Sequence, residues 1–474
     1  MIQIQDKNVE NQVYFPKSTN ITGDLVLKLH SELTQKDYTF DVVNESKTSN
    51  YYKFNVNFKS VENGEYVYFI NDTDSGLIRI GNVDEAVSTS TYIDGIEVVQ
   101  YYPQDVKETD YSKEPLTFKI LSYGTINWTT SDSSLTKTIE YKLNDGEWTH
   151  ITSNTEPSAS AIVVTRGNKI QFRGDNTSYS DGLSYNTFGS STAEFEVEGN
   201  IMSLIYGDDF KNKLTISSDY AFYGLFSDCV NLVSAKNLVL PANTLATYCY
   251  SSMFYGCRLL ASAPKALPAT TLASSCYDSM FYGCSSLTTA PALPATTLAN
   301  YCYLYMFQGC TSLTTAPSLP ATTLAGACYY GMFYGCTSLT VASELPATKL
   351  EVGCYEYMFW DCTGLTTVPS NLLPATTLKE SCYYNMFRGC SSLTSAPVLP
   401  ATTLAMHCYS GMFYGCIKLN HIKCLATDIS ATYCTSYWLK GVAATGTFVK
   451  PSSMTSWPTG SDGIPDNWTI ENNI

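Results

Sequence analysis

The sequence has little charge, little histidine and none of the common catalytic motifs. Only 15% of its 474 residues are charged, four are His, and no Asp, Glu, Lys or Arg occurs between Ser279 and Ser343. There is no Gly-x-Ser-x-Gly elbow, no phosphate-binding loop and no His-Glu-x-x-His. The recurring Cys-Tyr pairs have no nearby His that could activate a thiol. We therefore predict no catalytic residues, no metal site, no cofactor and no enzymatic activity.

Export and membrane signals are also missing. The chain starts Met1-Ile-Gln-Ile-Gln, without the basic residues and apolar core of a secretory signal, so we expect release into the cytoplasm where it is made. No stretch is long and apolar enough to cross a bilayer, which predicts no membrane insertion. The net charge of −15 argues against nucleic acid and anionic membranes as partners.

What the sequence does have is a repeat, Cys-Tyr-x-x-Met-Phe-x-Gly-Cys. Successive copies are 26 residues apart, with single steps of 27 and 28. A fixed step of this size predicts stacked units that bury their apolar faces against one another. Seven copies occur, the fifth with Asp361 in place of Gly: Cys249–Cys257, Cys276–Cys284, Cys302–Cys310, Cys328–Cys336, Cys354–Cys362, Cys382–Cys390 and Cys408–Cys416.

Each repeat suggests a helix followed by a strand. If the first Cys is position 0, then Cys, Tyr, Met and Phe at positions 0, 1, 4 and 5 share one side of a helix at 100° per residue. Thr271 or Thr297 is a candidate N-cap, and the Gly at position 7 suits a left-handed residue ending the helix. Leu287 to Ala290 then predicts a short strand that Pro291 ends.

The string Met-Phe-x-Gly-Cys-Ser-Ser-Leu resembles BspA-like leucine-rich repeats, over about residues 214–448. That class occurs in surface proteins of gut and oral bacteria and in their phages, and its plan implies a strand-turn-helix solenoid, here over 219–445. The inserted Leu-Pro-Ala-Thr-Thr-Leu-Ala departs from the commonest form of the class. Degenerate copies at Asp219–Leu232 and Cys434–Val442 are expected to end the stack.

All 17 cysteines lie in the repeats. They could form disulfides, remain reduced in the core or bind zinc. Disulfides need oxidising surroundings and partners, whereas reduced Cys is a small, usually buried apolar residue. Ala221 and Val442 replace Cys in the degenerate copies, which favours reduced thiols in the core. Zinc binding is disfavoured, because there is no paired Cys-x-x-Cys and the histidines are scattered.

Residues 1–104 predict an all-β domain, followed by a polar linker over 105–114. Asn63-Gly64 is a hairpin signal between two of the predicted strands. The segment Gly64 to Gly81 resembles small N-terminal β-domains of structural proteins from Bacteroides phages, including crAss-like ones, which implies docking onto a virus particle. The alternative is an ordinary β-sandwich with no docking role. The predicted strands are Tyr38–Val43, Tyr51–Phe58, Tyr66–Ile70 and Leu77–Ile80.

Residues 115–199 predict a second β-sandwich, immunoglobulin-like, with Asn144-Asp145-Gly146 as a hairpin turn. Thr138 to Trp148 resembles the sandwich modules that precede such repeats in Bacteroides proteins and that space and present a neighbour. Trp128 and Trp148 could bind sugars, although a place in the core is the favoured interpretation. The predicted strands are Leu116–Leu121, Thr125–Thr129, Thr138–Leu143, Ile162–Thr165, Lys169–Arg173 and Ala193–Val197.

The predicted fold is thus mostly β with an α/β solenoid: two N-terminal β-sandwich domains followed by leucine-rich repeats. Residues 200–218 and 446–474 are expected to cover the first and last strand edges of the stack. Asp208 and Asp209 are a poor glycosidase pair, because neighbours on a strand point to opposite faces.

Outward positions of the repeats suggest a binding surface. Stacked repeats would align the side chains at these outward positions as an aromatic strip with little charge, which suits contact with a sugar or a protein surface. The alternative is that the rings only pack on one another along the flank. The Thr row at 288, 314, 340, 366 and 394 is a second candidate, although Thr commonly finishes an exposed sheet. The candidate binding residues are Tyr255, Tyr282, Tyr305, Tyr334, Trp360, Tyr384, Arg388 and Tyr414.

These patterns lead to a functional hypothesis. We expect a structural protein of a phage particle, an appendage on tail or head, that docks on other virion proteins through residues 1–104 and recognises a host glycan or protein through its repeats. It would be assembled in the host cytoplasm, and a homo-oligomer is compatible with this role. The first alternative is a bacterial cell-surface adhesin, and the second is a glycan-degrading enzyme.

Overall fold

The computed structural model consists of two compact units, residues 1–110 and 111–474. The structure describes residues 2–4, 10–16, 24–31, 36–43, 51–58, 60–61, 64–70, 74–80, 87–93, 96–102 and 109–473. Residues 105–108 of the predicted linker over 105–114 therefore lie outside the described residues, while Tyr111–Lys113 forms the short 3-10 helix η1.

The first unit is built of β-strands, as predicted. Leu25, Leu27 and Leu29 alternate with more exposed residues along one strand and are buried, which is the pattern of a sheet with one face on a core. One sheet has the order β1 (Ile2–Ile4), β7 (Asp74–Ile80), β6 (Gly64–Ile70), β3 (Asp24–Ser31) and β4 (Lys36–Val43). The strand pairs are β2 (Glu10–Pro16) with β5 (Tyr51–Asn57), and β8 (Val87–Ile93) with β9 (Ile96–Tyr102).

The hairpin predicted at Asn63-Gly64 is wrong. Strand β5 pairs with β2, whereas β6 pairs with β3 and β7. The chain turns earlier, where the Val61 amide donates to the Phe58 carbonyl at 2.8 Å, and both side chains are buried. Strand β5 ends at Asn57, before this turn, and the next strand, β6, belongs to a different sheet.

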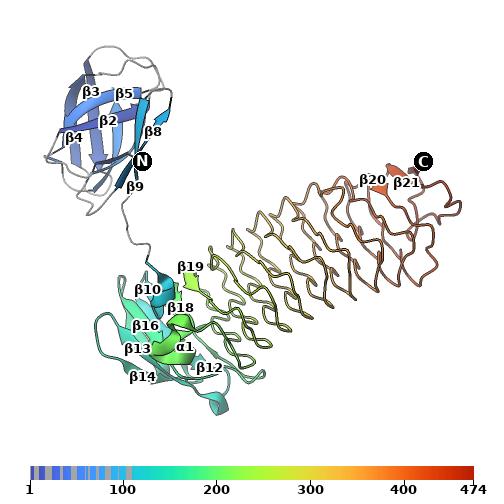
Figure 1. Cartoon of the computed structure of the whole chain (residues 1–474), viewed down its shortest axis with the longest axis horizontal. Helices are drawn as coiled ribbons and strands as arrows, with labels where there is room; N and C mark the ends of the chain where they lie inside the picture. The colour runs from blue at the N-terminus through green and yellow to red at the C-terminus, as the bar shows by residue number, and fades with distance from the viewer. Residues whose placement is uncertain are drawn as a thin grey trace. The chain divides into compact units, whose positions relative to one another are not determined.

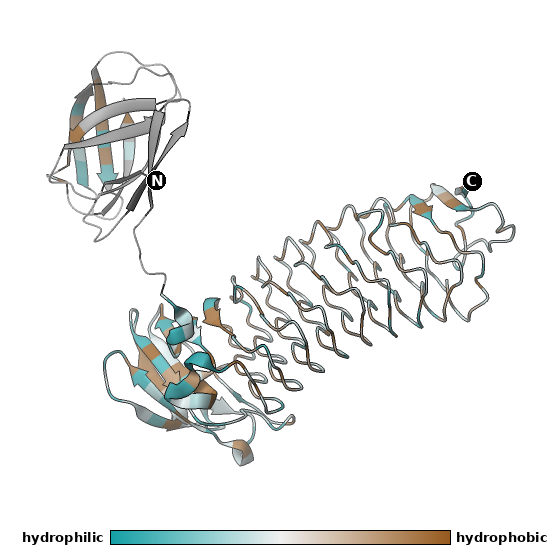
Figure 2. Cartoon of the chain, viewed as in Figure 1, coloured by the Kyte–Doolittle hydropathy of each residue, from teal (hydrophilic) through white to brown (hydrophobic). Residues whose placement is uncertain are grey.

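The second unit starts with the predicted sandwich. Along its strands hydrophobic and hydrophilic residues alternate (Figure 2). Its hairpin turn is confirmed, since Asn144 has φ +52° and the Gly146 amide donates to Leu143 at 3.1 Å. The main sheet has the order β14 (Thr149–Thr152), β13 (Thr138–Leu143), β16 (Lys169–Arg173), β10 (Leu116–Ile120), β18 (Phe195–Asn200) and β19 (Leu232–Val239). The facing pairs are β11 (Gly124–Asn127) with β15 (Ala161–Val164), and β12 (Thr129–Thr130) with β17 (Asn186–Thr187).

The sandwich and the repeats share one sheet and one hydrophobic core. Strand β18 of the sandwich pairs in parallel with β19 of the first repeat. Across the same boundary, the rings of Phe188 and Phe226 stack at 5.8 Å. The sandwich itself therefore covers much of the first edge, together with Leu214–Ile216, which bonds to Thr244. Between them lie the α-helix α1 (Ser203–Tyr206) and the 3-10 helix η4 (Gly207–Asn212).

The repeated helix predicted by the apolar arc is wrong. The Cys-Tyr-x-x-Met-Phe-x-Gly-Cys segments are successive turns, and α1 is the one α-helix among the described residues. In the repeat at Cys302, the residues at positions −1, 3 and 7 have left-handed φ angles: Tyr301 +59°, Tyr305 +50° and Gly309 +72°. A left-handed residue at every fourth position turns the backbone again before a helix can propagate. The prediction of a left-handed Gly is confirmed, but that Gly ends a run of turns.

Backbone hydrogen bonds between repeats replace those of a helix. We call one repeat a tier. Tyr303, Tyr305 and Phe307 donate their amides to carbonyls of the next tier at 3.0, 2.9 and 2.9 Å, while the amides between them donate three residues back. The predicted strands are reduced to isolated parallel bridges such as Ser262 with Thr289. The tiers follow one another as stacked coils from the sandwich towards the C-terminus (Figure 1).

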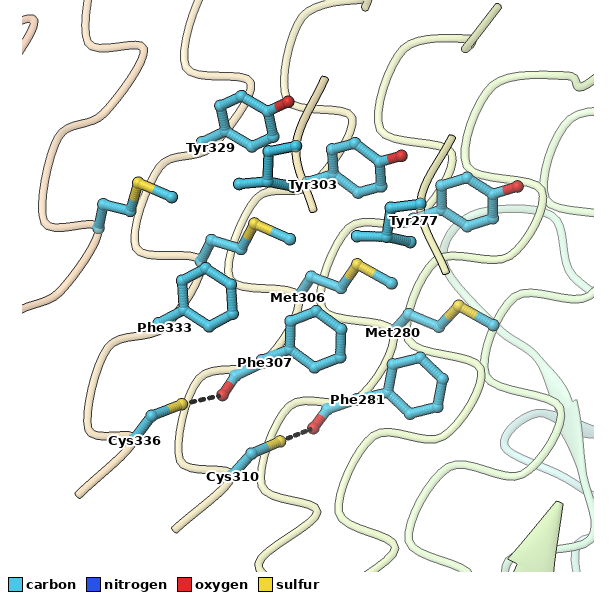
Figure 3. Close-up of a cluster of buried hydrophobic side chains, with 14 of the residues drawn as sticks. Tyr277, Met280, Phe281, Tyr303, Met306, Phe307, Cys310, Tyr329, Phe333 and Cys336 are labelled. Carbon is cyan, nitrogen blue, oxygen red and sulfur yellow. Dashed lines mark hydrogen bonds between the residues drawn. The ribbon is translucent and has the colours of Figure 1, made fainter. Parts of the chain in front are cut away.

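Identical side chains stack along the core. The buried Tyr of each tier lies over the next, as for Tyr277 and Tyr303 at 5.8 Å. A parallel stack of phenylalanines includes Phe281 and Phe307 at 5.6 Å. Figure 3 shows both stacks with the Met side chains between them. Each neighbouring pair adds a favourable aromatic contact beyond its burial.

The cysteines line the same core as free thiols, and all 17 are buried. The second Cys of a tier donates its S–H to the Phe carbonyl of the tier before, as Cys310 does to Phe281 at 3.1 Å (Figure 3). Cys229 makes the same contact with Phe188 of the sandwich at 3.4 Å. Burial raises the pKa of the Cys249 thiol to about 12. These contacts fit the interpretation of the cysteines as core residues.

The C-terminal segment adds a small parallel sheet to the last tier. Trp457 stacks on buried Trp438 at 5.6 Å, and the Trp468 indole donates to the Ala443 carbonyl at 2.8 Å. The sheet has the order β20 (His421–Lys423), β21 (Thr447–Pro451) and β22 (Thr469–Asn473). Within the described part of the chain, no helix has the length and apolar character needed to cross a membrane.

Candidate binding surface

Position 6 of each tier lies between an inward Phe and a left-handed residue, usually Gly, so its side chain points away from the core. This explains why the predicted position-6 residues share one flank. All eight predicted binding residues are partly exposed. We call the position-6 side chains the outer row: Tyr255, Tyr282, Gln308, Tyr334, Trp360, Arg388, Tyr414 and Lys440.

Rings in the outer row lie face to face along the stack. Tyr255 and Tyr282 stack at 4.7 Å, and Tyr334 and Trp360 stack at 4.9 Å. The Arg388 guanidinium lies 4.8 Å from the Trp360 ring centre and 4.3 Å from that of Tyr414. Cation–π contacts of this kind are favourable at partly exposed sites. The outer row therefore uses its ring faces internally and turns edges and hydroxyl groups towards solvent.

A second row of aromatic residues runs beside it, and we call it the inner row. Its members are Tyr305, Tyr330, Tyr357, Tyr384, His407 and Tyr433. The first four contact one another edge to face, with centroids 5.0 to 5.5 Å apart and interplanar angles of 73° to 89°. His407 and Tyr433 stack at 5.2 Å, at 21°. Of these six, the sequence analysis named Tyr305 and Tyr384 as candidate binding residues.

The inner row depends on small residues in alternate tiers. Tyr305 and Tyr357 come from position 3, whereas Tyr330 and Tyr384 come from position 2 of the tiers where position 3 is Gly331 or Asn385. A Cβ added to Gly331 would lie 2.4 Å from the Tyr305 ring. The alternation of large and small residues at position 3 is a signal in the sequence that could have revealed this row.

A carboxylate without a cationic partner among the described residues lies beside the inner row. Glu356, at position 2 of its tier, is half-buried, and burial raises its pKa to about 7. Burial, together with the charge of Glu356, raises the pKa of Tyr357 to about 12. The Asp361 carboxyl beside Arg388 also has a raised pKa, because its desolvation outweighs the guanidinium charge.

The Thr row is fully exposed but largely satisfied by the stack itself. The hydroxyl groups of Thr288, Thr340 and Thr394 donate to carbonyls of the preceding tier at 3.2 to 3.5 Å. This geometry fits the interpretation of these residues as the finish of an exposed edge. It offers no side-chain group comparable to Glu356 or Arg388.

The two sandwich tryptophans lie in different environments. Trp128 is fully buried, and its indole donates to the Lys137 carbonyl at 2.9 Å, as expected of a core residue. Trp148 is half-exposed, with Arg173 over its ring at 4.2 Å, so a place in the core is wrong for this residue. Arg173 in turn binds Glu140 at 2.7 Å beside a cavity of about 480 Å³.

The prediction that Asp208 and Asp209 lie on a strand is wrong, because both lie in the 3-10 helix η4. Asp208 forms a salt bridge with Arg173 at 2.6 Å, which fits a structural role. Among the residues that the structure describes, no group of three or more His, Cys, Asp or Glu side chains could hold a metal ion.

Comparison with known proteins identifies one region of the chain. Residues 209–339 and 329–437 match the BspA type leucine rich repeat region, in six copies. The match covers the tiers that form both aromatic rows. No curated protein and no solved structure matches the chain. Repeats of this type are typical of surface and binding proteins and generally have no enzymatic activity.

Proposed function

We propose that the chain, through its BspA-type leucine-rich repeats, recognises a cell surface, and that it does so as an appendage of a phage particle. The observation that carries the proposal is the flank of the stack, where two rows of half-exposed aromatic side chains run across successive tiers. Partly exposed aromatic residues with few charges suit contact with another molecule. Arg388 and Lys440 at one end add hydrogen-bond donors.

Support for mounting on a particle comes from the division of the chain. Residues 1–110 form a compact unit of their own, which could dock on other virion proteins while the repeats face outward. The resemblance of Gly64 to Gly81 to phage structural domains points the same way. Virion proteins and a host glycan or protein are thus the proposed partners, and the virion is the proposed location.

Two measurements test this proposal. The fluorescently labelled full chain should bind intact cells of the host strain, and mass spectrometry of purified particles should detect the chain as a component. Absence of cell binding would contradict surface recognition. Cell binding without the chain in particles would favour the alternative, a bacterial cell-surface adhesin, since that protein would use the same flank from the cell's own surface.

The third hypothesis, a glycan-degrading enzyme, gives a different outcome in the same system. An enzyme would release soluble sugars from host capsule or cell-wall preparations, whereas a binding protein would leave the preparation intact. Chromatography of the supernatant after incubation with the full chain separates the two.

A further inference from the structure

Two rings of the inner row, Tyr330 and Tyr384, have faces that no other ring covers. Tyr357 lies within 33° of Trp360, whose plane is within 11° of Tyr334 in the outer row. The outer-row rings stack in the direction in which the tiers follow one another. Because Tyr357 is close to parallel with them, its two faces also point in that direction. Tyr330 and Tyr384, one tier to either side of Tyr357 and nearly perpendicular to it, must then contact those faces with their edges.

Tyr330 and Tyr384 are also nearly perpendicular to their other aromatic neighbours. Tyr384 is 86° from His407, and Tyr330 is 89° from Tyr305. Among residues 109–473, no further ring or cation contacts either tyrosine. The faces of Tyr330 and Tyr384 are therefore not used in the row, unlike those of the outer row.

Tyr330 and Tyr384 also have a defined spacing. Each occupies position 2 of its tier, two tiers apart, with centroids 5.0 and 5.5 Å from Tyr357, so they lie at most about 10.5 Å from each other. Two strand-like steps of about 4.8 Å give a similar separation. Two aromatic rings at this distance suit an extended polymer of flat units. Every second unit of such a polymer would lie on one of the two tyrosine rings.

Glu356 occupies position 2 of the tier between them. Its half-buried carboxylate has no cation to neutralise it among the described residues, and it can accept hydrogen bonds from hydroxyl groups brought by a ligand. A half-buried acceptor of this kind gains more from a ligand donor than one that remains fully hydrated. The flank thus alternates an aromatic ring, an acceptor and a second aromatic ring.

The charge of the surroundings narrows the ligand class. The net charge of the chain is −15, and Tyr330 lies in the stretch from Ser279 to Ser343 that has no charged side chain. An anionic polymer would meet Glu356 without a dedicated cation beside it, whereas a neutral sugar presents both C–H faces for the rings and hydroxyl groups for the carboxylate. A flat protein segment is the competing occupant, and it would not require the two-tier spacing.

We propose that Tyr330, Glu356 and Tyr384 bind an extended, uncharged polysaccharide across three tiers, with one sugar ring on each tyrosine face and hydroxyl groups of the chain on Glu356. This inference rests on the proposed role in surface recognition and names the class of ligand that the repeats take. Of the two aromatic rows, it assigns the site to the inner row.

The experiment uses the full chain in native affinity gels that contain one soluble polysaccharide each. Neutral glucans, mannans, xylans and galactans are the probes, and alginate and heparin are the anionic comparators. We expect at least one neutral polymer to retard the wild-type chain. Tyr330→Leu and Tyr384→Leu should each weaken that binding about tenfold or more, because a platform of the size of one sugar ring is removed.

Matched variants separate this role from a structural one. Tyr384→Phe keeps the ring and should bind within about threefold of wild type, and Glu356→Gln keeps the shape but loses the charge and should bind several-fold more weakly, by about 1 kcal/mol for one charge-assisted hydrogen bond. Tyr123→Leu removes an exposed ring of the sandwich that belongs to neither aromatic row, and it should leave binding unchanged. Circular dichroism of each variant establishes that it is folded.

Three results would overturn the inference: no neutral polymer retards the chain, an anionic polymer binds more tightly than every neutral one, or Tyr123→Leu weakens binding as much as Tyr384→Leu. If the same variants still bind host cells as wild type does, surface recognition stands and the polysaccharide site falls. If the wild-type chain binds no cells, the proposed function itself has failed.

Discussion

At the scale of single residues, the cysteines have one environment in every tier. Sixteen of the 17 occupy position 0 or 8 of a tier, and Cys424 is the exception. All are buried without a sulfur partner, as Cys310 illustrates through its contact with the Phe281 carbonyl. Substitution of Cys by Ala221 in the degenerate first copy signalled this role in the sequence, because a disulfide would not tolerate alanine. The sequence gives no such signal for the ring orientations on the flank. A tyrosine that contacts its neighbour with its edge cannot be distinguished in the sequence from one that contacts it with its face.

The thiols should therefore be unreactive in the native protein. Burial raises the pKa of Cys249, Cys302 and Cys354 to about 12, so almost no thiolate exists near pH 8. We expect a chromogenic disulfide reagent to label almost no thiol in buffer at pH 8 and to label all 17 in concentrated guanidinium. Intact mass after purification in air should equal that of the fully reduced chain. A deficit of two mass units per cysteine pair would contradict this prediction.

Glu356 should make stability depend on pH. Its pKa of about 7 in the folded chain is above the ordinary value of an unfolded glutamate, so the folded state binds the proton more tightly. The free energy of unfolding should then fall as the pH rises from about 4.5 to 7 and remain lower above pH 7, where the half-buried carboxylate is charged.

Glu356→Gln tests this dependence in guanidinium unfolding at pH 4, 6 and 8. The variant should be more stable than wild type at pH 8 and equal to it at pH 4. Exposed Glu344, converted to Gln, is the matched control and should change stability at neither pH. A Glu356→Gln variant that gains as much at pH 4 as at pH 8 would rule out titration of this carboxylate as the cause.

At the scale of the element, the same pattern of apolar residues supports two backbone conformations. Positions 0, 1, 4 and 5 recur with a period of four, which is close enough to 3.6 to predict a helix. The structure uses a left-handed residue every fourth position instead, and the amides that a helix would satisfy internally reach the next tier, as Phe307 does. Hydrogen bonds 25 residues away in sequence lie outside what a local window can show, so the core positions were predictable but the conformation was not.

Two glycines separate the effect of backbone strain from that of a side-chain clash. Gly309 (φ +72°) has no atom closer than 3.7 Å to an added Cβ, so Gly309→Ala should lower the free energy of unfolding by about 1 kcal/mol, for the left-handed conformation alone. Gly331 (φ +57°) faces the Tyr305 ring at 2.4 Å, and Gly331→Ala should cost about 1–3 kcal/mol more. Guanidinium unfolding measures the free energy of unfolding of both variants. Equal losses would contradict the prediction and show that the Tyr305 ring moves away from the added Cβ at no cost.

At the scale of the whole molecule, the sandwich acts as part of the stack. The sequence predicts a separate spacer domain followed by a cap over residues 200–218, because the strand pattern of residues 115–199 is complete in itself. The pairing of β18 with β19 and the contact of Phe118 with Phe226 at 5.9 Å could not be predicted, since both depend on which edge of the sandwich meets the first tier. The sandwich thereby gives the first tier the neighbour that every other tier has.

Truncation tests whether the repeats need that neighbour. Residues 111–474 form one compact unit, so a chain starting at Tyr111 should unfold at the same Tm as the unit does in the full protein. A chain starting at Asp219 would expose the paired edge of β19, the ring of Phe226 and the thiol of Cys229, which bonds to Phe188 in the intact protein. We expect this shorter chain to aggregate, because an uncovered apolar tier with a free strand edge pairs with other copies. Calorimetry and size-exclusion chromatography of the two chains measure the outcome, and a monomeric 219–474 with an unchanged Tm would mean that the tiers are self-sufficient and the sandwich only a spacer.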